Sequence, residues 1–470
     1  MFDSASGLAT PTEGCAARLI GHMLGTLLTP EKSTVTNLIL THGGGRCDWS
    51  ADYRLYSRDR VDESRLFDKA REELLAHLAE DEPLVVGIDD TIVRKSGKKV
   101  HGSGWKRDPL GPAFQTNLVH AQRYLQFSAA RPLAHGKAHM IPIDFLHAPS
   151  PGKPGKDAQP DDHQAYREAL KQHNLNQQTI RRFQLLRDKV PASRRIVFTG
   201  DGSYTNREIL RALPEGCCYI GRARKDCALS YLPEAPTGSR RMGRPRRYGK
   251  PAPTPEQLCT DESVPWQQVE AFASGTRHTF RIKTIGPLLW AKSGTQLPLR
   301  LVVIAPVGYR LRKGSKLLYR KPAYLLCTDP DMDIAKLIQY YLWRWGIEVN
   351  FREEKTLIGT GDAHVRTQAS NQHLPAVTVA AYSLLWTAAL RGVRSHSDYP
   401  ATLQPPKWRN HRHLKARPPS TGDLLRLLRY EIWAAAIRPG TLYHFASTAP
   451  PTTTAQKLSP NLPAILFNAA

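Results

Sequence analysis

A fifteen-residue stretch, Tyr341 to Lys355, constrains the fold of this chain more than any other; it reads YLWRWGIEVNFREEK. On a helix, the turn of about 100° per residue places four side chains of different chemistry within roughly a 60° arc: Tyr341, Arg344, Glu348 and Lys355. We call these four residues the polar stripe. Bulky apolar residues are interleaved with it, which indicates that much of the helix is buried: Trp343, Trp345, Ile347, Val349 and Phe351.

A solvated helix face with surface ion pairs would give a similar pattern, and each such pair contributes only about 0.2–0.5 kcal/mol. The interleaved aromatic residues count against that interpretation, because a buried carboxylate such as Glu348 needs partners or a metal ion. We therefore predict one helix that carries the whole stripe, with Asp331 as its N-terminal cap.

Two short apolar runs upstream each lead into aspartate. Pro83–Ile88 is followed by DDT at positions 89–91, and Arg195–Thr199 is followed by GDGSY at positions 200–204. Such runs are typical of buried strands, and rigid carboxylates at strand ends suit a divalent-metal site. A lone aspartate at either place would instead indicate a turn or a helix cap. Successive strand residues face opposite sides, so only one of the first two aspartates can face the metal directly.

The spacing Y-x-x-R-x-x-x-E-x-x-x-x-x-x-K resembles the signature of the DDE transposases of bacterial insertion sequences, in the branch named for its Tyr-Arg-Glu-Lys motif. The resemblance implies that Glu348 is the third catalytic carboxylate. It implies Asp90, which stands just before a threonine, as the first, and Asp201, in an Asp-Gly-x-Tyr sequence, as the second. The resemblance covers about residues 83–390 and is best at these three motifs.

By the same resemblance, the three carboxylates bind two Mg²⁺ ions about 3.5–4 Å apart around a scissile phosphate, and Mn²⁺ can substitute. One ion activates water for 3′-strand nicking at the transposon end, and the other stabilises the leaving oxygen. The freed 3′-hydroxyl then attacks target DNA. Arg344 and Lys355 are expected to bind phosphate oxygens, and Tyr341 to hydrogen-bond the same backbone. Trp345 matches an aromatic residue that supports a flipped base in some relatives.

The composition agrees with a nucleic-acid partner. The chain of 470 residues has a formal net charge of +24, which favours binding to a polyanion; a ribosome-like or membrane-surface role is the alternative. We expect no membrane span and no signal peptide. Seven scattered cysteines without C-x-x-C spacing argue against a zinc site and predict free thiols in a reducing cytoplasm. With DNA as the expected partner, we predict a cytoplasmic, nucleoid-associated protein.

We expect an α/β fold: a ribonuclease-H-like catalytic core with a β-rich insertion, a helical N-terminal domain and a basic C-terminal region. The predicted domains are a helical DNA-binding domain at 1–80, the first part of the core at 81–224, the basic insertion at 225–321, the second part of the core with the Glu348 helix at 322–391, and a partly disordered region at 392–470. On sequence alone, dimerisation or packing is an equally good role for the N-terminal helices.

Within these regions we predict helices at Cys15–Leu28, Glu31–Thr41 (capped by Thr29), Ser64–Ala79, Asp162–Lys189, Thr205–Leu213, Leu374–Leu390 and Leu424–Ile437. The predicted core strands, beyond the two that lead into aspartate, are Asn117–Ala130, His139–His147, Cys217–Ala223 and Ala323–Cys327. Further strands are expected in the insertion at Val269–Phe272, Thr279–Ile285, Leu299–Pro306 and Tyr309–Leu311.

Three basic segments are candidates for DNA contact: the loop Arg94–Arg107, for which a mobile surface loop is an equally good interpretation, Ser239–Lys250 and Pro405–Arg417. The second contains Gly243-Arg244-Pro245-Arg246, which looks like the core of a minor-groove hook, although a basic loop that grips backbone phosphates is the better interpretation. Its candidate DNA-binding residues are Arg240, Arg241, Arg244, Arg246 and Arg247.

The best interpretation of the sequence is a DNA transposase that cleaves insertion-sequence ends and transfers the 3′-hydroxyl strand, acting as a homodimer on DNA. One alternative is a metal-dependent DNA nuclease without strand transfer. A second is a catalytically silent DNA-binding protein derived from a transposase, against which the complete set of three carboxylates argues.

Overall fold

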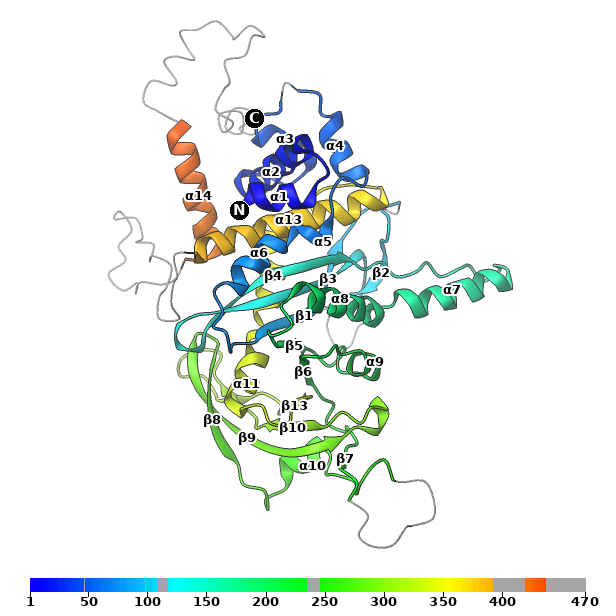
Figure 1. The fold of residues 1–470 in the computed structure, drawn as a ribbon, viewed down its shortest axis with the longest axis vertical. Helices are drawn as coiled ribbons and strands as arrows, with labels where there is room; N and C mark the ends of the chain where they lie inside the picture. The colour runs from blue at the N-terminus through cyan, green and yellow to red at the C-terminus, as the bar shows by residue number, and fades with distance from the viewer. Residues whose placement is uncertain are drawn as a thin grey trace, which may run out of the picture.

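Figure 1 shows the fold in a computed structural model, which describes residues 1–45, 47–97, 99–108, 111, 117–234, 246–391 and 419–436. From one end of the molecule to the other lie the N-terminal helices, the long helix α13 (Gln368–Leu390), the central sheet and the curved strands of residues 267–304. The whole Pro405–Arg417 segment, the last 25 residues, Arg240, Arg241 and Arg244 fall outside the described residues.

One mixed sheet of eleven strands organises the chain. At its centre β1, β3 and β4 form an antiparallel meander, and β5 and β6 continue parallel to β1, giving the spatial order β4-β3-β1-β5-β6. The bounds of the core strands are β1 Leu84–Arg94, β2 Gly104–Arg107, β3 Leu118–Pro132, β4 Ala138–His147, β5 Ile196–Gly200 and β6 Cys217–Arg222. This mixed α/β arrangement is consistent with the expected ribonuclease-H-like core.

Strand β1 is longer than the apolar run predicts. The run ends at Ile88, but residues 89–94 continue the strand because they pair antiparallel with residues 121–126 of β3. Only the parallel ladder stops early, and its last pair is Gly87 with Thr199 of β5. The two aspartates therefore lie within a strand that is paired on one side, and the prediction of a strand end at this place was wrong.

Most strands of the insertion extend the core sheet, whereas Gly308–Tyr309 and Leu318–Tyr319 pair with each other in a separate two-stranded sheet. Strand β13 pairs antiparallel with β6, and β10, β9 and β7 follow in order. An edge strand with unpaired backbone groups favours such additions. The elements here are β7 Ser230–Tyr231, α10 Pro255–Thr260, β8 Gln267–Ala273, β9 Thr276–Leu289, the 3-10 turn Ala291–Ser293, β10 Leu299–Ile304, β11 Gly308–Tyr309, β12 Leu318–Tyr319 and β13 Ala323–Cys327.

The N-terminal helices begin elsewhere than expected. Thr29 does not start a helix; its N–H donates to the Gly25 carbonyl and ends α2. The next helix begins after Thr34, whose hydroxyl accepts from the Asn37 N–H. The predicted helix at 64–79 is two short helices joined at the buried Phe67. The bounds are α1 Phe2–Ala9, α2 Glu13–Leu28, α3 Val35–Thr41, α4 Ser50–Ser57, α5 Glu63–Leu66 and α6 Asp68–Leu75.

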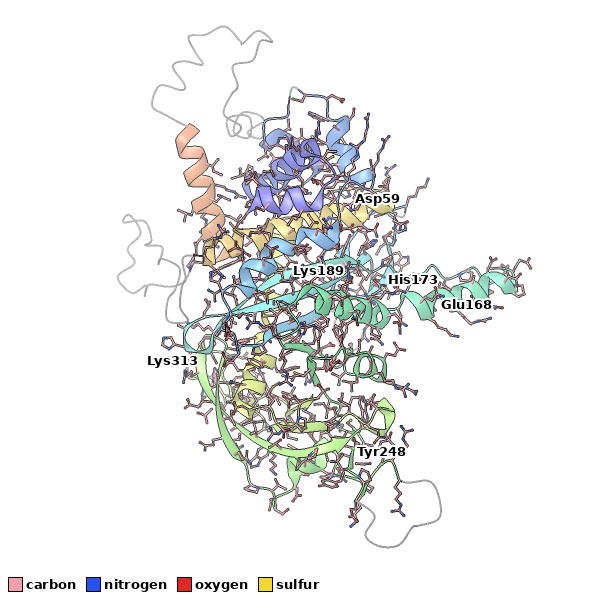
Figure 2. The ribbon with its side chains drawn as sticks, in the orientation of Figure 1. Asp59, Glu168, His173, Lys189, Tyr248 and Lys313 are labelled. Carbon is pink, nitrogen blue, oxygen red and sulfur yellow. The ribbon has the colours of Figure 1, made fainter. Side chains whose placement is uncertain are left out.

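The predicted helix at 162–189 is also divided. Helix α7 (Pro160–His173) ends before Asn174, whose side chain caps α8 (Leu175–Lys189) by accepting from the Gln177 N–H. No residue of α7 is buried, and Figure 2 shows Glu168 and His173 on this helix, which projects from the body of the molecule. The short helix α9 (Arg207–Arg211) follows β5, and a 3-10 turn, Ala134–Gly136, joins β3 to β4.

The stripe residues do not share one helix: Tyr341 lies on the first of two helices, Glu348 and Lys355 on the second, and Arg344 between them. Helix α11 (Ile334–Trp343) ends before Arg344, and α12 (Gly346–Thr356) begins after Trp345. The cap of α11 is Asp333, whose carboxylate accepts from the Lys336 N–H, so the assignment of the cap to Asp331 was wrong. The interruption leaves Arg344 and Glu348 on the same side, since their side chains form an ion pair at 3.4 Å.

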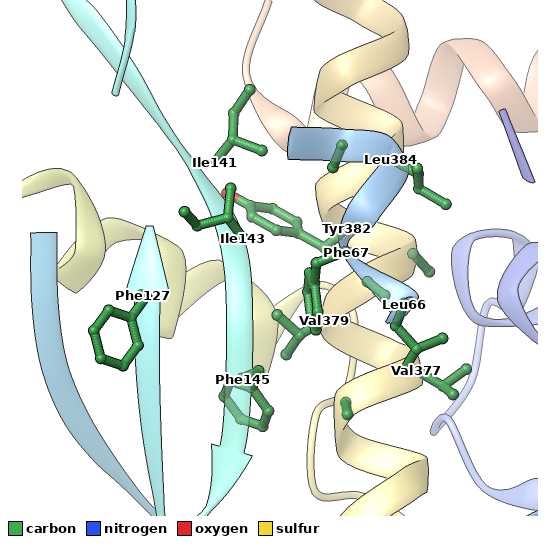
Figure 3. Packing of buried hydrophobic residues seen from close by; sticks show 14 of the residues in the cluster. Leu66, Phe67, Phe127, Ile141, Ile143, Phe145, Val377, Val379, Tyr382 and Leu384 are labelled. Atoms are coloured by element: carbon green, nitrogen blue, oxygen red, sulfur yellow. The ribbon is translucent and has the colours of Figure 1, made fainter. Parts of the chain in front are cut away.

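Helix α13 is the centre of the larger hydrophobic core. In Figure 3, Val379 and Tyr382 face Ile143 and Phe145 of β4, and Phe67 packs beside them. The helix is long and apolar enough to cross a membrane, contrary to the expectation, but 89% of its apolar window is buried inside the protein. Burial of that kind is typical of a core helix. Helix α14 (Thr421–Ala436) is the last element that the structure describes.

Candidate active site

Three elements bring four carboxylates to one region: Asp89 and Asp90 from β1, Asp201 directly after β5, and Glu348 from α12. Because β1 and β5 are parallel and Gly87 pairs with Thr199, the residues two positions further along, Asp89 and Asp201, are level with each other. The charge of Asp201 acts on each of the other three carboxyl groups. These four carboxylates form what we call the acidic centre, at the point where β1 and β5 diverge.

The two adjacent aspartates face opposite sides of β1. A Cβ atom at Gly87 would lie 2.9 Å from Ile347 Cδ1 and 3.5 Å from Arg344 Cγ, so this face of the strand packs tightly against α12. Asp89, two residues further, shares that face. Asp90 points the other way and accepts a hydrogen bond from the Tyr204 hydroxyl at 3.1 Å.

Arg344 links Asp89 to the stripe. Its Nη1 donates to Asp89 Oδ2 at 2.9 Å, and its Nη2 lies 3.4 Å from Glu348 Oε1. The guanidinium is largely buried, and among the described residues its buried Nε has no hydrogen-bond partner. One cation thus stands between two of the carboxylates, and the pair that it joins is Asp89 and Glu348. These contacts favour Asp89, rather than the Asp90 chosen from the resemblance, as the partner of Glu348.

Asp90 has its own cationic neighbours. Arg123 of β3 places Nε 3.2 Å from Asp90 Oδ2, and the charge of Lys106 of β2 also acts on this carboxyl group. Sequence reasoning missed Arg123, because only the register between β1 and β3 brings it here. Tyr204 was visible as the last residue of the Asp-Gly-x-Tyr sequence, but its contact with Asp90 was not.

Burial and like charges raise the proton affinity of the acidic centre. Burial raises the pKa of Asp89 to about 7, the Arg344 cation opposes the rise, and Asp201 adds to it. Burial likewise raises the pKa of Asp90 and of Glu348, opposed by Arg123 and Arg344 respectively. The centre therefore holds protons more readily than exposed carboxylates do and would gain from an added positive charge.

The remaining stripe residues lie around this centre. Lys355 Nζ donates to Thr91 Oγ1 at 2.6 Å, on the same face of β1 as Asp89. The Arg344 guanidinium lies 5.8 Å from the centre of the Tyr341 ring. Trp345 is 61% exposed and is free to contact a ligand. The polar stripe therefore contacts β1 at Asp89 and at Thr91, the two residues that flank Asp90 in the sequence.

The arginines of the insertion are placed differently. Arg246 and Arg247 are exposed and adjoin Tyr248, which lies at the opposite end of the molecule from Asp59 and the N-terminal helices (Figure 2). Within the described part of the chain, neither arginine forms an ion pair with the acidic centre. The other three candidates, at positions 240, 241 and 244, lie outside the described residues.

The donor set of the acidic centre suits a hard divalent cation. Asp89, Asp201 and Glu348 offer only carboxylate oxygens, the ligands that Mg²⁺ and Mn²⁺ prefer. The charge of Asp201 raises the pKa of the other two, a repulsion that a bound cation would relieve. Among the described residues, the only group of three His, Cys, Asp or Glu side chains with all ligand atoms within 4.8 Å lies elsewhere. The side chains of the acidic centre must therefore move closer together to share an ion.

A family profile described as DDE superfamily endonuclease matches residues 21–285, more than half of the chain. The chain belongs to this family. The match contains Asp89, Asp90 and Asp201 and ends before the polar stripe. No curated protein matches the chain at a significant level.

Membership fixes the general chemistry. DDE endonucleases use divalent metal ions and cleave phosphodiester bonds in DNA, and the carboxylate oxygens of the acidic centre are of the type that such ions prefer. The family match ends at residue 285 and so does not include Glu348. A role for Glu348 is therefore supported by the contacts of α12 with β1 and not by the match.

One buried carboxyl group beside the centre has a testable role in stability. Glu354 of α12 accepts from Gln126 Nε2 at 3.0 Å, and burial raises its pKa from 4.5 to about 8. Between these two values the folded state keeps a proton that the unfolded state has lost, so stability falls as pH rises from about 4.5 to 8. We expect Glu354→Gln to raise the melting temperature at pH 8 by the equivalent of a few kcal/mol and to change it little at pH 4.5.

Thermal unfolding monitored by circular dichroism across this pH range checks the prediction. Glu168→Gln on the exposed helix α7 is the matched control and should leave the pH dependence unchanged. Equal destabilisation by Glu354→Gln at both pH values would show that Glu354 is ionised in the folded protein.

Proposed function

We propose that this DDE endonuclease is the transposase of a bacterial insertion sequence, of the branch with the Tyr-Arg-Glu-Lys signature. It cleaves DNA at the ends of the element and joins the 3′-hydroxyl to target DNA. One observation carries the proposal: the stripe brings Arg344 and Lys355 onto β1 at Asp89 and Thr91. A helix with only solvated ion pairs would not place both cations against the acidic strand.

The proposed metal ligands are Asp89, Asp201 and Glu348, and the proposed ions are two Mg²⁺, replaceable by Mn²⁺. Bound at these carboxylates, the ions supply Lewis-acid activation of the attacking oxygen and stabilisation of the leaving one. The choice of Asp89 departs from Asp90, which the resemblance favours. It is supported by the parallel register with Asp201 and by the guanidinium shared with Glu348.

The other residues bind and orient DNA in this proposal. Arg344 and Lys355 are cations beside the carboxylates, so a phosphate can take the place of their present oxygen partners. Tyr341 hydrogen-bonds the same backbone, and the exposed ring of Trp345 stacks on a base. Asp90 stays paired with Arg123 and Tyr204 and holds β1 and β3 in position.

The remaining regions have proposed roles of their own. The N-terminal helices recognise the ends of the element, the insertion grips phosphates, and two copies act together on DNA in the cytoplasm. The competing candidates are a nuclease without strand transfer and a silent DNA-binding protein.

Incubation of the protein with supercoiled plasmid that carries the inverted repeats from the flanks of the gene tests the proposal. With Mg²⁺ or Mn²⁺ we expect nicked and then joined products, and none with EDTA. Nicking without joined products would indicate the nuclease. Binding without any cleavage would indicate the silent protein, and absence of inverted repeats from the flanks would count against an insertion sequence.

The basic insertion should bind backbone phosphates. Replacing the five arginines at 240, 241, 244, 246 and 247 by alanine should weaken DNA binding and lower the log–log salt slope by about 0.9 for each phosphate that the variant no longer neutralises. Binding titrations at several salt concentrations measure both. The control removes five exposed cations around α7: Lys153, Lys156, Arg167, Lys171 and Arg181. An equal change in both variants would assign the effect to net charge alone.

A further inference from the structure

A cluster of metal-binding side chains lies among the N-terminal helices, away from the acidic centre. His22 comes from α2, His42 directly follows α3, and Asp52 comes from α4. One ligand atom of each lies within 4.8 Å of the others, and no other group of three His, Cys, Asp or Glu in the described residues meets that condition. The three residues are far apart in sequence, so the folded helices alone create the cluster.

The bonding inside the cluster is incomplete. His22 Nε2 lies 2.9 Å from Asp52 Oδ1, and the Tyr56 hydroxyl lies 2.9 Å from His22 Nδ1. His42 Nε2 is 4.0 Å from the same Asp52 oxygen and is buried with no hydrogen-bond partner among the described residues. Buried polar atoms are almost always paired, so this nitrogen, aimed at a carboxylate already bound by a second imidazole, calls for a ligand.

We propose that His22, His42 and Asp52 bind a transition-metal ion, with Zn²⁺ as its representative. Two imidazole nitrogens and one carboxylate oxygen are a ligand set that suits zinc. Tetrahedral ligands at zinc bond lengths lie about 3.3–3.5 Å apart. The observed separations of 2.9 and 4.0 Å fall on either side of that value, so movements of less than about 1 Å complete the site.

The surroundings support the ligands. With metal on Nε2, His22 carries its proton on Nδ1, where it donates to the Tyr56 oxygen; a second hydrogen bond of this kind commonly fixes a metal-bound histidine. Gly21 lets the His42 ring lie close to α2, because a Cβ atom there would be 3.1 Å from His42 Cγ. The His42 side chain is 23% exposed, which leaves a route for the ion and room for water as a fourth ligand.

This site differs from the acidic centre in the ion that it selects. The acidic centre offers oxygens alone, whereas the cluster offers two nitrogens, so zinc should bind the cluster in the presence of excess Mg²⁺. The bound ion would join α2, α3 and α4 directly. Metal bound only by the folded state stabilises it.

Calorimetry of the full chain with Zn²⁺ in millimolar Mg²⁺ tests the proposal. We expect one tight site in the wild-type protein and a rise in melting temperature on adding one equivalent. His42→Ala and Asp52→Asn should each weaken that site by at least about 100-fold and abolish the rise, and Tyr56→Phe should weaken it about 10-fold. His364→Ala, which removes an exposed histidine, should change neither.

The His42 Nε2 atom has no hydrogen bond within the described part of the chain, so His42→Ala should fold like the wild type, as circular dichroism can verify. X-ray absorption of the zinc-loaded chain should show nitrogen and oxygen neighbours only. Equal zinc affinity in the wild-type and His42→Ala proteins would overturn the proposal. So would sulfur at the metal, which would assign the binding to cysteine thiols.

Discussion

Asp201→Ala and Glu348→Ala should each lower DNA cleavage by at least about 10³-fold, because each removes a proposed metal ligand whose contribution is several kcal/mol. Binding to DNA should remain largely intact, since neither side chain is a phosphate contact. Nicking of supercoiled plasmid in Mg²⁺ measures the first effect, and a gel-shift titration measures the second. Glu353→Ala, on the same helix, removes a carboxylate that bonds Tyr382 and Thr421 instead, and it should keep most of the activity if it folds.

The same assay separates the two adjacent aspartates. Asp89→Asn keeps the size of the side chain but removes the charge shared with Arg344, and we expect cleavage to fall as far as in the Asp201 variant. Asp90→Asn can still accept the hydrogen bond from Tyr204 and should retain measurable activity. The opposite result, a dead Asp90 variant and an active Asp89 variant, would restore the assignment that the resemblance favours.

Strands β1, β5, β6 and β13 could be predicted from the sequence because each contains a short apolar run. Strand β2, with the sequence GWKR, has no such run and was not predicted. The bounds were less predictable where tertiary pairing decides them. Strand β1 continues through two aspartates because β3 pairs with it, although aspartate is depleted in strands and marks their ends in sequence. The Thr29-Pro30 pair has the composition of a helix start, yet the Thr29 N–H closes the helix before it.

For the acidic centre too, some features could be predicted from the sequence and others depend on tertiary packing. Asp201 was predicted from its place at a strand end and Glu348 from the spacing of the polar stripe, both with the resemblance, and the structure brings both near β1. Alternation of side chains along a strand says only that Asp89 and Asp90 face opposite sides. It does not say which of the two faces the other carboxylates. The close packing of Gly87 against Ile347 shows which side of β1 faces α12. Arg123 had no signal at all, because strand register alone places it beside Asp90.

The His22–His42–Asp52 cluster was invisible for a related reason. Metal motifs are recognisable in sequence when their ligands are a few residues apart on one element. Here His22 and Asp52 lie on α2 and α4, and His42 directly follows α3, whose first residue was also predicted wrongly. Only the packing of α2, α3 and α4 reveals the cluster.

Arg344→Ala should lower cleavage or strand joining by about 10²–10³-fold, the usual effect of removing a group that stabilises developing charge. Lys355→Ala should do the same. Arg344→Lys should not restore full activity, because an ammonium group cannot reproduce the fork that now reaches both Asp89 and Glu348. Arg352→Ala is the matched control, since this exposed cation lies on α12 with Lys355 and pairs with its neighbour Glu353.

Calorimetry of Mn²⁺ binding in the presence of DNA distinguishes positioning from metal binding in these variants. A guanidinium cannot ligate a metal, so Arg344→Ala should keep the metal site. Removal of the Arg344 cation should, however, raise the pKa of Asp89 above about 7, because that cation now opposes the rise. Activity of this variant should therefore recover in part as pH increases from 7 to 9, whereas Lys355→Ala, which contacts Thr91 instead, should show no such recovery. Near-normal activity in both alanine variants would indicate that the polar stripe is only a row of surface ion pairs. It would also remove the main support for the transposase assignment.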